Sequence, residues 1–119
     1  MAPITAVSLS PFLKAAREMG LGDNDIEAIE TLVAYAPEEG ILLEGTGGVR
    51  KRRIALPNRN KGKSGGGRLF TVFVSAQSPV YIITMIDKTV SENLSKQERN
   101  ELATLVRDLK AASRRRRHV

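Results

Sequence analysis

The segment from Gly47 to Arg68 reads GGVRKRRIALPNRNKGKSGGGR, and the rest of the chain is best interpreted outward from it. It contains eight Lys or Arg residues, and no Asp or Glu occurs between Gly45 and Ile86. A dense cationic segment with glycines beside it can bring both charge and backbone close to a phosphate. The segment therefore predicts a nucleic-acid ligand.

The same segment indicates a β-rich half of the chain. Val49 to Leu56 has the composition of a strand, and Pro57 to Gly67 is rich in Asn, Gly, Lys and Ser, which is typical of a loop. Ile41 to Leu43 precedes it across the glycine turn GTGG. Two further β-rich runs follow, Leu69 to Val74 and Val80 to Ile86, joined by a turn at Gln77-Ser78-Pro79.

Helices are predicted on both sides of these strands. The first starts at Ser10-Pro11 and runs to about Met19, and the second starts at a capping pair formed by Asn24 and Glu27. Apolar residues recur at helical spacing in the second helix, at Ile26, Ile29, Leu32 and Val33. A third helix starts at Ser95, which has Glu98 three residues later. It places one apolar stripe on the sheet, formed by Leu102, Leu105, Val106 and Leu109.

The predicted fold class is thus α+β: two N-terminal helices, an antiparallel sheet of about four strands and a C-terminal helix. With 119 residues and no repeats, residues 1–119 are expected to form a single domain. From about Ser113 the apolar content falls, which predicts a mobile basic tail.

Composition excludes several kinds of chemistry. The chain has no cysteine, and its one histidine, His118, is next to the last residue, so a thiol nucleophile or a His-based site is not expected. No run approaches a membrane span, and the first residues do not resemble a signal peptide, so a cytoplasmic protein is expected. The net charge of +6 is unevenly distributed: eight acids and no Lys or Arg lie between Glu18 and Val49. This predicts a polarised surface with one face for a polyanion.

Four motifs together resemble the RelE/ParE toxin superfamily, and within it the HigB-like branch. These toxins typically show a GGxRKxR strand, a GKSGGxR turn, a lysine that ends the next strand and an ENLS helix start. All four occur here in that order, at Gly47 to Arg53, Gly62 to Arg68, Lys88 and Glu92 to Ser95. The resemblance extends over roughly Asp25 to Leu109.

The resemblance implies the fold, the activity and the partners. It implies a RelE-like microbial RNase fold and a ribosome-dependent mRNA endonuclease (an mRNA interferase) that cuts the codon in the ribosomal A site. It implies a HigA-like antitoxin that blocks the toxin and represses their shared operon, and hence an indirect link to operator DNA. No metal and no cofactor are implied, because the 2′-OH of the RNA is the nucleophile.

The resemblance also implies roles for four residues. Arg68 stabilises the phosphate in the transition state, because a guanidinium grips phosphate oxygens in a bidentate way. Lys61 and Lys63 hold the mRNA backbone and exchange protons, and Lys88 is brought to Arg68 at the end of the neighbouring strand. From the residues alone, each also has a structural interpretation, as an ion-paired arginine or as solvated lysines.

Further cations are candidates for RNA or ribosome binding. Alternation along a strand sends Arg50 and Arg52 to one face and Lys51 and Arg53 to the other. We favour Arg50 and Arg52 as the pair that faces RNA. The remaining candidates are Arg59, Ser64, Arg114 and Arg115.

Two features depart from the family pattern and leave rival functions open. The family usually has an aromatic residue before the strand arginine, where this chain has Gly67, and the strand LFTVFV offers only Phe70 and Phe73. Base stacking is worth roughly 1–3 kcal/mol per base, so a weakened activity is predicted. A ParE-like, non-catalytic inhibitor of DNA gyrase and a basic nucleic-acid-binding module without catalysis are the alternatives.

Overall fold

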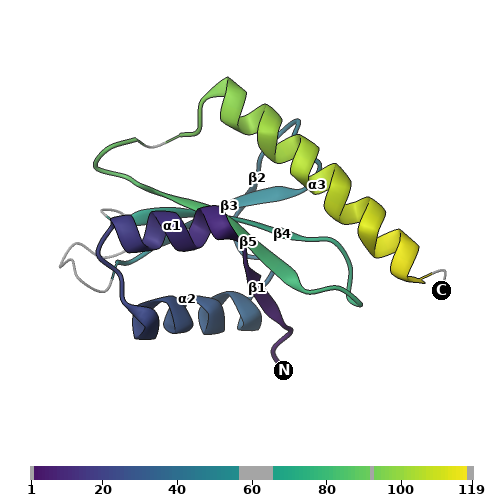
Figure 1. The fold of residues 1–119 in the computed structure, drawn as a ribbon, viewed down its shortest axis with the longest axis horizontal. Coiled ribbons are helices and arrows are strands. Elements are labelled where there is room, and N and C mark those ends of the chain that lie inside the picture. Colours follow the sequence, from purple (N-terminus) through teal and green to yellow (C-terminus); the bar gives the residue numbers. More distant parts are fainter. Residues whose placement is uncertain (1, 57–65, 92, 118–119) are drawn as a thin grey trace.

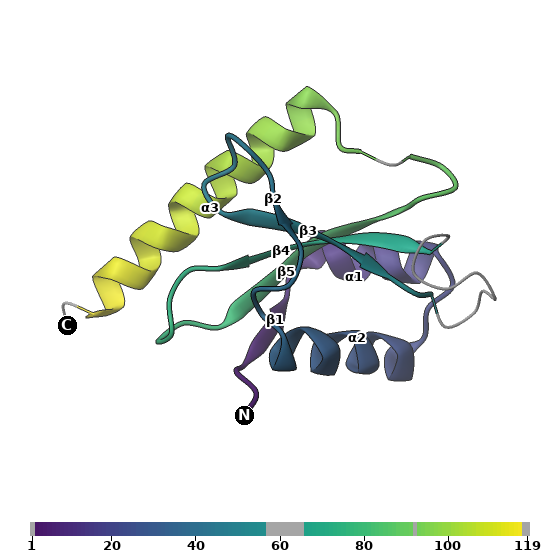
Figure 2. The same cartoon turned by 180° about the vertical axis from the view of Figure 1, so that it is seen from behind.

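The computed structural model describes residues 2–56, 66–91 and 93–117, and it confirms the α+β class. Within these residues three helices accompany a five-stranded sheet (Figures 1 and 2). The elements in chain order are β1 (Ala6–Ser8), α1 (Ser10–Glu18), α2 (Asp23–Tyr35), β2 (Ile41–Leu42), β3 (Val49–Ile54), β4 (Gly67–Phe73), β5 (Val80–Asp87) and α3 (Lys96–Arg117). None of the helices in the described part of the chain is long and apolar enough to span a membrane.

The sheet has the strand order β1-β5-β4-β3-β2 and is mixed rather than purely antiparallel. The strand β1 pairs parallel with β5, with Ala6 opposite Val80, and the other pairs are antiparallel. The sequence-based prediction of about four antiparallel strands was wrong on this point. Three residues are too few to show a period-2 pattern, and β1 is specified by its partner from the other half of the chain.

Helices cover both faces of the sheet (Figure 1). One core lies between the sheet and the first two helices, and it joins Phe12 and Ile29 to Leu69 and Ile82. The second core lies under α3, where Leu102 and Val106 pack on β4 and β5. Each face of the sheet therefore has its own apolar layer, and a side chain on a strand belongs to one layer or the other.

The helix starts agree with the sequence in part. At α3 the Ser95 Oγ accepts from the Glu98 amide at 3.1 Å, and the Ser95 amide donates to Glu98 Oε1 at 2.9 Å, which is the predicted capping box. At α2 the Gly22 amide donates to Asp25 Oδ2 at 2.9 Å, so the capping pair is Gly22 and Asp25, two residues before the predicted pair Asn24 and Glu27.

Two details of the helices differ from the sequence-based predictions. Leu32 is 44% exposed, because the buried stripe of α2 is limited to Ile26, Ile29 and Val33. The helix α3 continues to Arg117, beyond Ser113, where the sequence predicts that regular structure ends. Ser113 is itself buried, so the helix is still in contact with the fold at that position.

Candidate nucleic-acid interface

The register between β3 and β4 decides which face each cation of β3 occupies. Arg52 lies opposite Leu69, which belongs to the core under α1 and α2. Lys51 lies opposite Phe70, which belongs to the core under α3. Paired residues on neighbouring strands share a face, so Arg50 and Arg52 point to the side of α1 and α2, and Lys51 and Arg53 to the side of α3.

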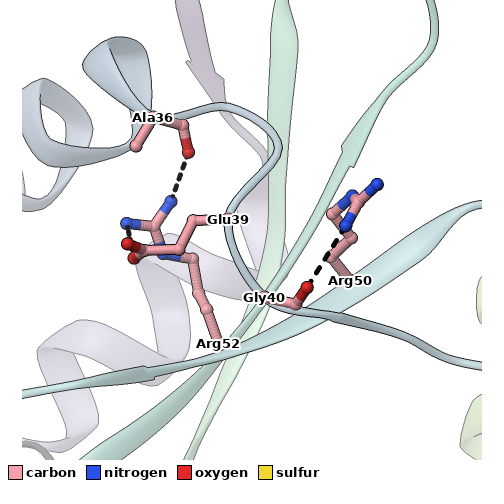
Figure 3. Close-up of polar contacts among 5 residues, drawn as sticks. All are labelled: Ala36, Glu39, Gly40, Arg50 and Arg52. Atoms are coloured by element: carbon pink, nitrogen blue, oxygen red, sulfur yellow. Dashed lines mark hydrogen bonds and ion pairs between the residues drawn. The ribbon is translucent and has the colours of Figure 1, made fainter.

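Arg50 and Arg52 hold the connection between α2 and β2 (Figure 3). The Arg52 guanidinium donates to Glu39 Oε2 at 2.6 Å and to the Ala36 carbonyl at 2.8 Å, and the side chain is almost fully buried. The Arg50 guanidinium donates to the Gly40 carbonyl at 3.2 Å. Ala36 is the C-cap of α2, and its carbonyl accepts from the Arg52 guanidinium and from the Glu39 amide at 3.2 Å, so Arg52 helps to close the helix end.

These contacts argue against the choice of Arg52 as a residue that faces RNA, and they give Arg50 one contact with the protein's own backbone. Burial lowers the pKa of Arg52, and the attraction of Glu39 opposes this effect and keeps the guanidinium paired. A side chain that is 3% exposed and bonded to two acceptors is not available to a phosphate. The physical reason is register, which places this pair against the protein's own backbone.

The glycine at position 40 allows this connection to lie against β3. Its φ is +114°, and a Cβ there would lie 2.8 Å from the carbonyl oxygen of Lys51. Only glycine adopts this conformation without strain and leaves room for the strand. Residues 36–40 therefore lie over the face of β3 that carries Arg50 and Arg52.

The opposite face of β3 holds the cations that converge. Arg53 is exposed and lies directly opposite Arg68 across the β3–β4 pairing. Arg68 is 1% exposed, and one of its nitrogens donates to the Gly67 carbonyl at 3.1 Å. Side chains in such cross-strand pairs are about 4.5–5.5 Å apart at Cβ, and like charges there are destabilising. The two guanidinium groups therefore add to the positive potential at this end of the sheet.

Lys51 connects this face to the segment before α3. Its ammonium donates to Asn93 Oδ1 at 2.9 Å. The Ser91 hydroxyl donates to the backbone carbonyl of Asn93 at 2.8 Å, so the segment is bonded within itself as well. Sequence analysis did not select Asn93; only the fold brings it beside β3.

Lys88 lies at the same end of the sheet as Arg53 and Arg68. Its amide donates to the Gly66 carbonyl at 3.1 Å, which continues the β4–β5 pairing by one step. The side chain is half-buried, and within the described residues its ammonium makes no ion pair. The carboxylate of Asp87, its neighbour, accepts from the amide and hydroxyl of Thr89. The predicted approach of Lys88 to Arg68 agrees with this topology.

The glycines before Arg68 have a packing role. A Cβ at Gly66 would lie 2.2 Å from the Ile54 carbonyl, and one at Gly67 would lie 3.3 Å from Ile86 O. Glycine is thus required where the start of β4 passes β3 and β5, whether or not a phosphate approaches. Arg59, Lys61, Lys63 and Ser64 lie in 57–65, outside the described residues, and their convergence with Arg68 stays a prediction.

The aromatic residues are placed away from this end of the sheet or inside the fold. Phe70 is 1% exposed and is part of the core under α3, so it offers no stacking surface. Tyr81 is buried, as its position in a strand predicts. Tyr35 is 58% exposed at the end of α2. Within the described residues, no group of three or more His, Cys, Asp or Glu side chains could hold a metal ion.

Comparison with solved structures shows which fold this chain shares. The chain is similar to the structure of an arginine-to-alanine double mutant of the E. coli toxin RelE in the free state. The TM-score is 0.52 and the sequence identity 19%, over 87% of this chain and 96% of that chain. The class is therefore that of small α+β proteins with the RelE fold.

The family follows from the sequence. A family model described as the RelE toxin of the RelE/RelB toxin–antitoxin system matches residues 9–117. Since that match spans nearly the whole chain, this protein belongs to the RelE family of toxins from toxin–antitoxin systems.

Proposed function

We propose that this toxin is a ribosome-dependent mRNA endonuclease of the HigB-like branch, which cuts mRNA in the ribosomal A site. The observation that carries the proposal is the Arg53–Arg68 pair. Arg53 is exposed directly opposite the buried Arg68, so both guanidinium groups contribute positive potential at one accessible point of the sheet, and a phosphate is a ligand of matching charge. Lys51 and Lys88 border the same region and add to its positive potential.

The proposed chemistry is an attack of the RNA 2′-OH on the adjacent phosphorus. The P–O5′ bond breaks, and the products are a 2′,3′-cyclic phosphate and a 5′-OH. The 2′-OH loses its proton to a base and the leaving O5′ gains one from an acid, with Lys61, Lys63 and Lys88 proposed for these transfers. Neither a metal nor a cofactor takes part.

The two arginines differ in solvent exposure, and we therefore propose different roles for them. Arg53 is the accessible one, so we assign it the direct, bidentate contact with the phosphate oxygens. Arg68 is buried, and its fixed charge on the neighbouring strand stabilises the negative charge that develops on the pentavalent phosphorus. Since Phe70 is unavailable for stacking, we expect base positioning by the ribosome and a lowered intrinsic activity.

The partners follow from the proposed activity. A HigA-like antitoxin neutralises the toxin in the cytoplasm, where translating ribosomes are found. Its most direct means is an acidic segment that covers the cationic end of the sheet.

The test is cell-free translation of a defined mRNA, with new 5′ ends located by primer extension. Arg53→Ala and Lys88→Ala are compared with wild type, and Arg17→Ala, an exposed arginine on α1, is the matched control. Loss of one charge-assisted bond to the phosphate predicts a roughly 10–100-fold lower cleavage rate for Arg53→Ala. The control should cut at the wild-type rate.

Intact mRNA with the wild-type protein would exclude the nuclease. Inhibition of DNA supercoiling by gyrase would then support the ParE-like alternative. Cleavage that needs no ribosome would retain the nuclease and remove its ribosome dependence.

A further inference from the structure

The long helix α3 carries many of its cations on one side. At 100° per residue, five of them lie within an arc of roughly 80°. We call this set the basic flank of α3; its members are Lys96, Arg99, Arg107, Lys110 and Arg114. At the same pitch the acids Glu98, Glu101 and Asp108 lie about 100° or more from every member of the flank, whereas Arg115 lies on the side of Glu101 and Asp108.

This separation differs from an ordinary solvated helix surface. Acids and bases on exposed helices are commonly spaced three or four apart, where they neutralise each other. Within the described residues, no acid lies within ion-pair distance of any member of the basic flank. Lys96, Arg107 and Arg114 are exposed, so their charge faces solvent.

The basic flank borders a hollow with a floor of small residues. The hollow lies between α3 and the turn before β3, and it is lined by Gly45, Thr46, Gly47, Ala103, Arg107 and Lys110. The Lys110 ammonium donates to the Gly47 carbonyl at 2.6 Å, which ties the turn to the helix. A Cβ at Gly47, where φ is +79°, would lie 3.3 Å from Val106 Cγ1, so glycine permits this close approach.

The basic flank is remote from the arginine pair. Lys110 contacts the turn that precedes Val49, the first residue of β3. Arg53 lies near the other end of β3, opposite Arg68 of β4. Figure 1 shows α3 crossing its face of the sheet and continuing beyond it to the C-terminal end. A ligand on the basic flank would therefore not fill the proposed cleavage site.

We propose that the basic flank of α3 binds the phosphate backbone of double-helical RNA. From Lys96 to Arg114 the helix rises about 27 Å, a straight array of cations that matches a rigid run of phosphates. No aromatic side chain lies on this flank, so single-stranded bases have nothing to stack on. An interface for a protein would be expected to offer apolar or aromatic anchors, and Ala103 alone does not. Within the proposed function, on which this step rests, the duplex is a helix of ribosomal RNA.

The experiment measures binding of the full-length protein to a fluorescein-labelled RNA duplex of about 20 base pairs by anisotropy, a length that exceeds the rise of the flank. The variant Arg107→Gln/Arg114→Gln removes two exposed charges from the flank. The matched control, Lys14→Gln/Arg17→Gln, removes two exposed charges from α1 and changes the net charge equally. Circular dichroism melting verifies that both variants are folded.

The expected result is a change in salt dependence that is confined to the flank variant. The slope of log K against log salt should fall by about 2, which is roughly one for each phosphate that the variant no longer neutralises. At physiological salt the flank variant should bind at least about tenfold more weakly, and the control should remain within about twofold of wild type. Equal losses in both variants, or none in either, would overturn the proposal.

Two further comparisons keep the outcome distinct from the proposed function. Duplex binding requires neither translation nor cleavage, so the flank variant should lose duplex affinity whether or not the wild-type protein cuts mRNA. A flank variant that binds the duplex like wild type would refute this surface even if the wild-type protein cuts mRNA. Labelled polyglutamate is the second probe. If the flank variant loses polyglutamate binding and keeps duplex binding, the surface belongs to an acidic protein and the RNA proposal fails.

Discussion

Strand β3 presents Arg50 and Arg52 on one face of the sheet and Lys51 and Arg53 on the other, and the surroundings of the two pairs differ. The first pair is enclosed by residues 36–40 and donates to three acceptors of the protein itself. On the second face, Arg53 is exposed opposite Arg68, and Lys51 has one side-chain acceptor in Asn93. Four consecutive cations of similar chemistry thus divide into a pair bonded to residues 36–40 and a pair on the opposite face, and the division follows from strand alternation.

The largest expected effect tests the structural pair. Arg52→Ala removes a buried ion pair, takes one of two donors from the Ala36 carbonyl and empties the space of the side chain. We expect the free energy of unfolding to fall by about 3 kcal/mol, at the low end for a buried pair because Glu39 is half-exposed. Arg53→Ala, the neighbour on the other face, should change it by less than about 0.5 kcal/mol.

Urea unfolding followed by circular dichroism measures both variants. Equal, small changes would show that Arg52 is not engaged with Glu39 in solution. The distinction between the faces would then fail, and Arg52 would again be available to RNA.

Features set by residues close together in the sequence could be predicted, whereas features set by pairing between distant segments could not. The capping box at Ser95 and the β-rich runs are local signals, and they predicted α3 and the central strands. The faces of β3 are set by pairing: Val49 and Ile54 are both buried, yet their positions have opposite parity and they belong to different cores. Alternation alone therefore could not show which cations face the protein, and only the register with Phe70 does.

The same reason explains which candidate residues the motifs could select and which they could not. Arg68 and Lys88 were selected from motifs, and the strand ends bring them to one end of the sheet. Sequence analysis favoured Arg52 over Arg53, although strand alternation contains no signal that tells which face meets RNA. Asn93 and β1 depend on contacts between distant segments, which periodicity does not report.

The next prediction concerns the closed face. Thr71 lies opposite Arg50, is fully buried, and has no hydrogen-bond partner for its hydroxyl among the described residues. If this face is core, Thr71→Val removes an unsatisfied polar group at nearly constant shape and should stabilise the protein by about 1 kcal/mol. The melting temperature should rise by about 3–5 °C. A fall instead would mean that the hydroxyl has a partner and that polar groups on this face are functional.

The smallest effect is expected on the open face, where Asn93→Ala removes the acceptor of Lys51. This bond joins exposed groups, so water replaces it and the free energy of unfolding should change by less than about 0.5 kcal/mol. The corresponding change on the closed face, Glu39→Gln, removes the countercharge of a buried guanidinium and should cost clearly more. In the same variants, RNA affinity should be kept or slightly raised by Asn93→Ala, because Lys51 becomes free to bind phosphate. Anisotropy with single-stranded RNA measures this, and a severalfold loss of affinity would show that Asn93 positions Lys51 for the ligand rather than competing with it.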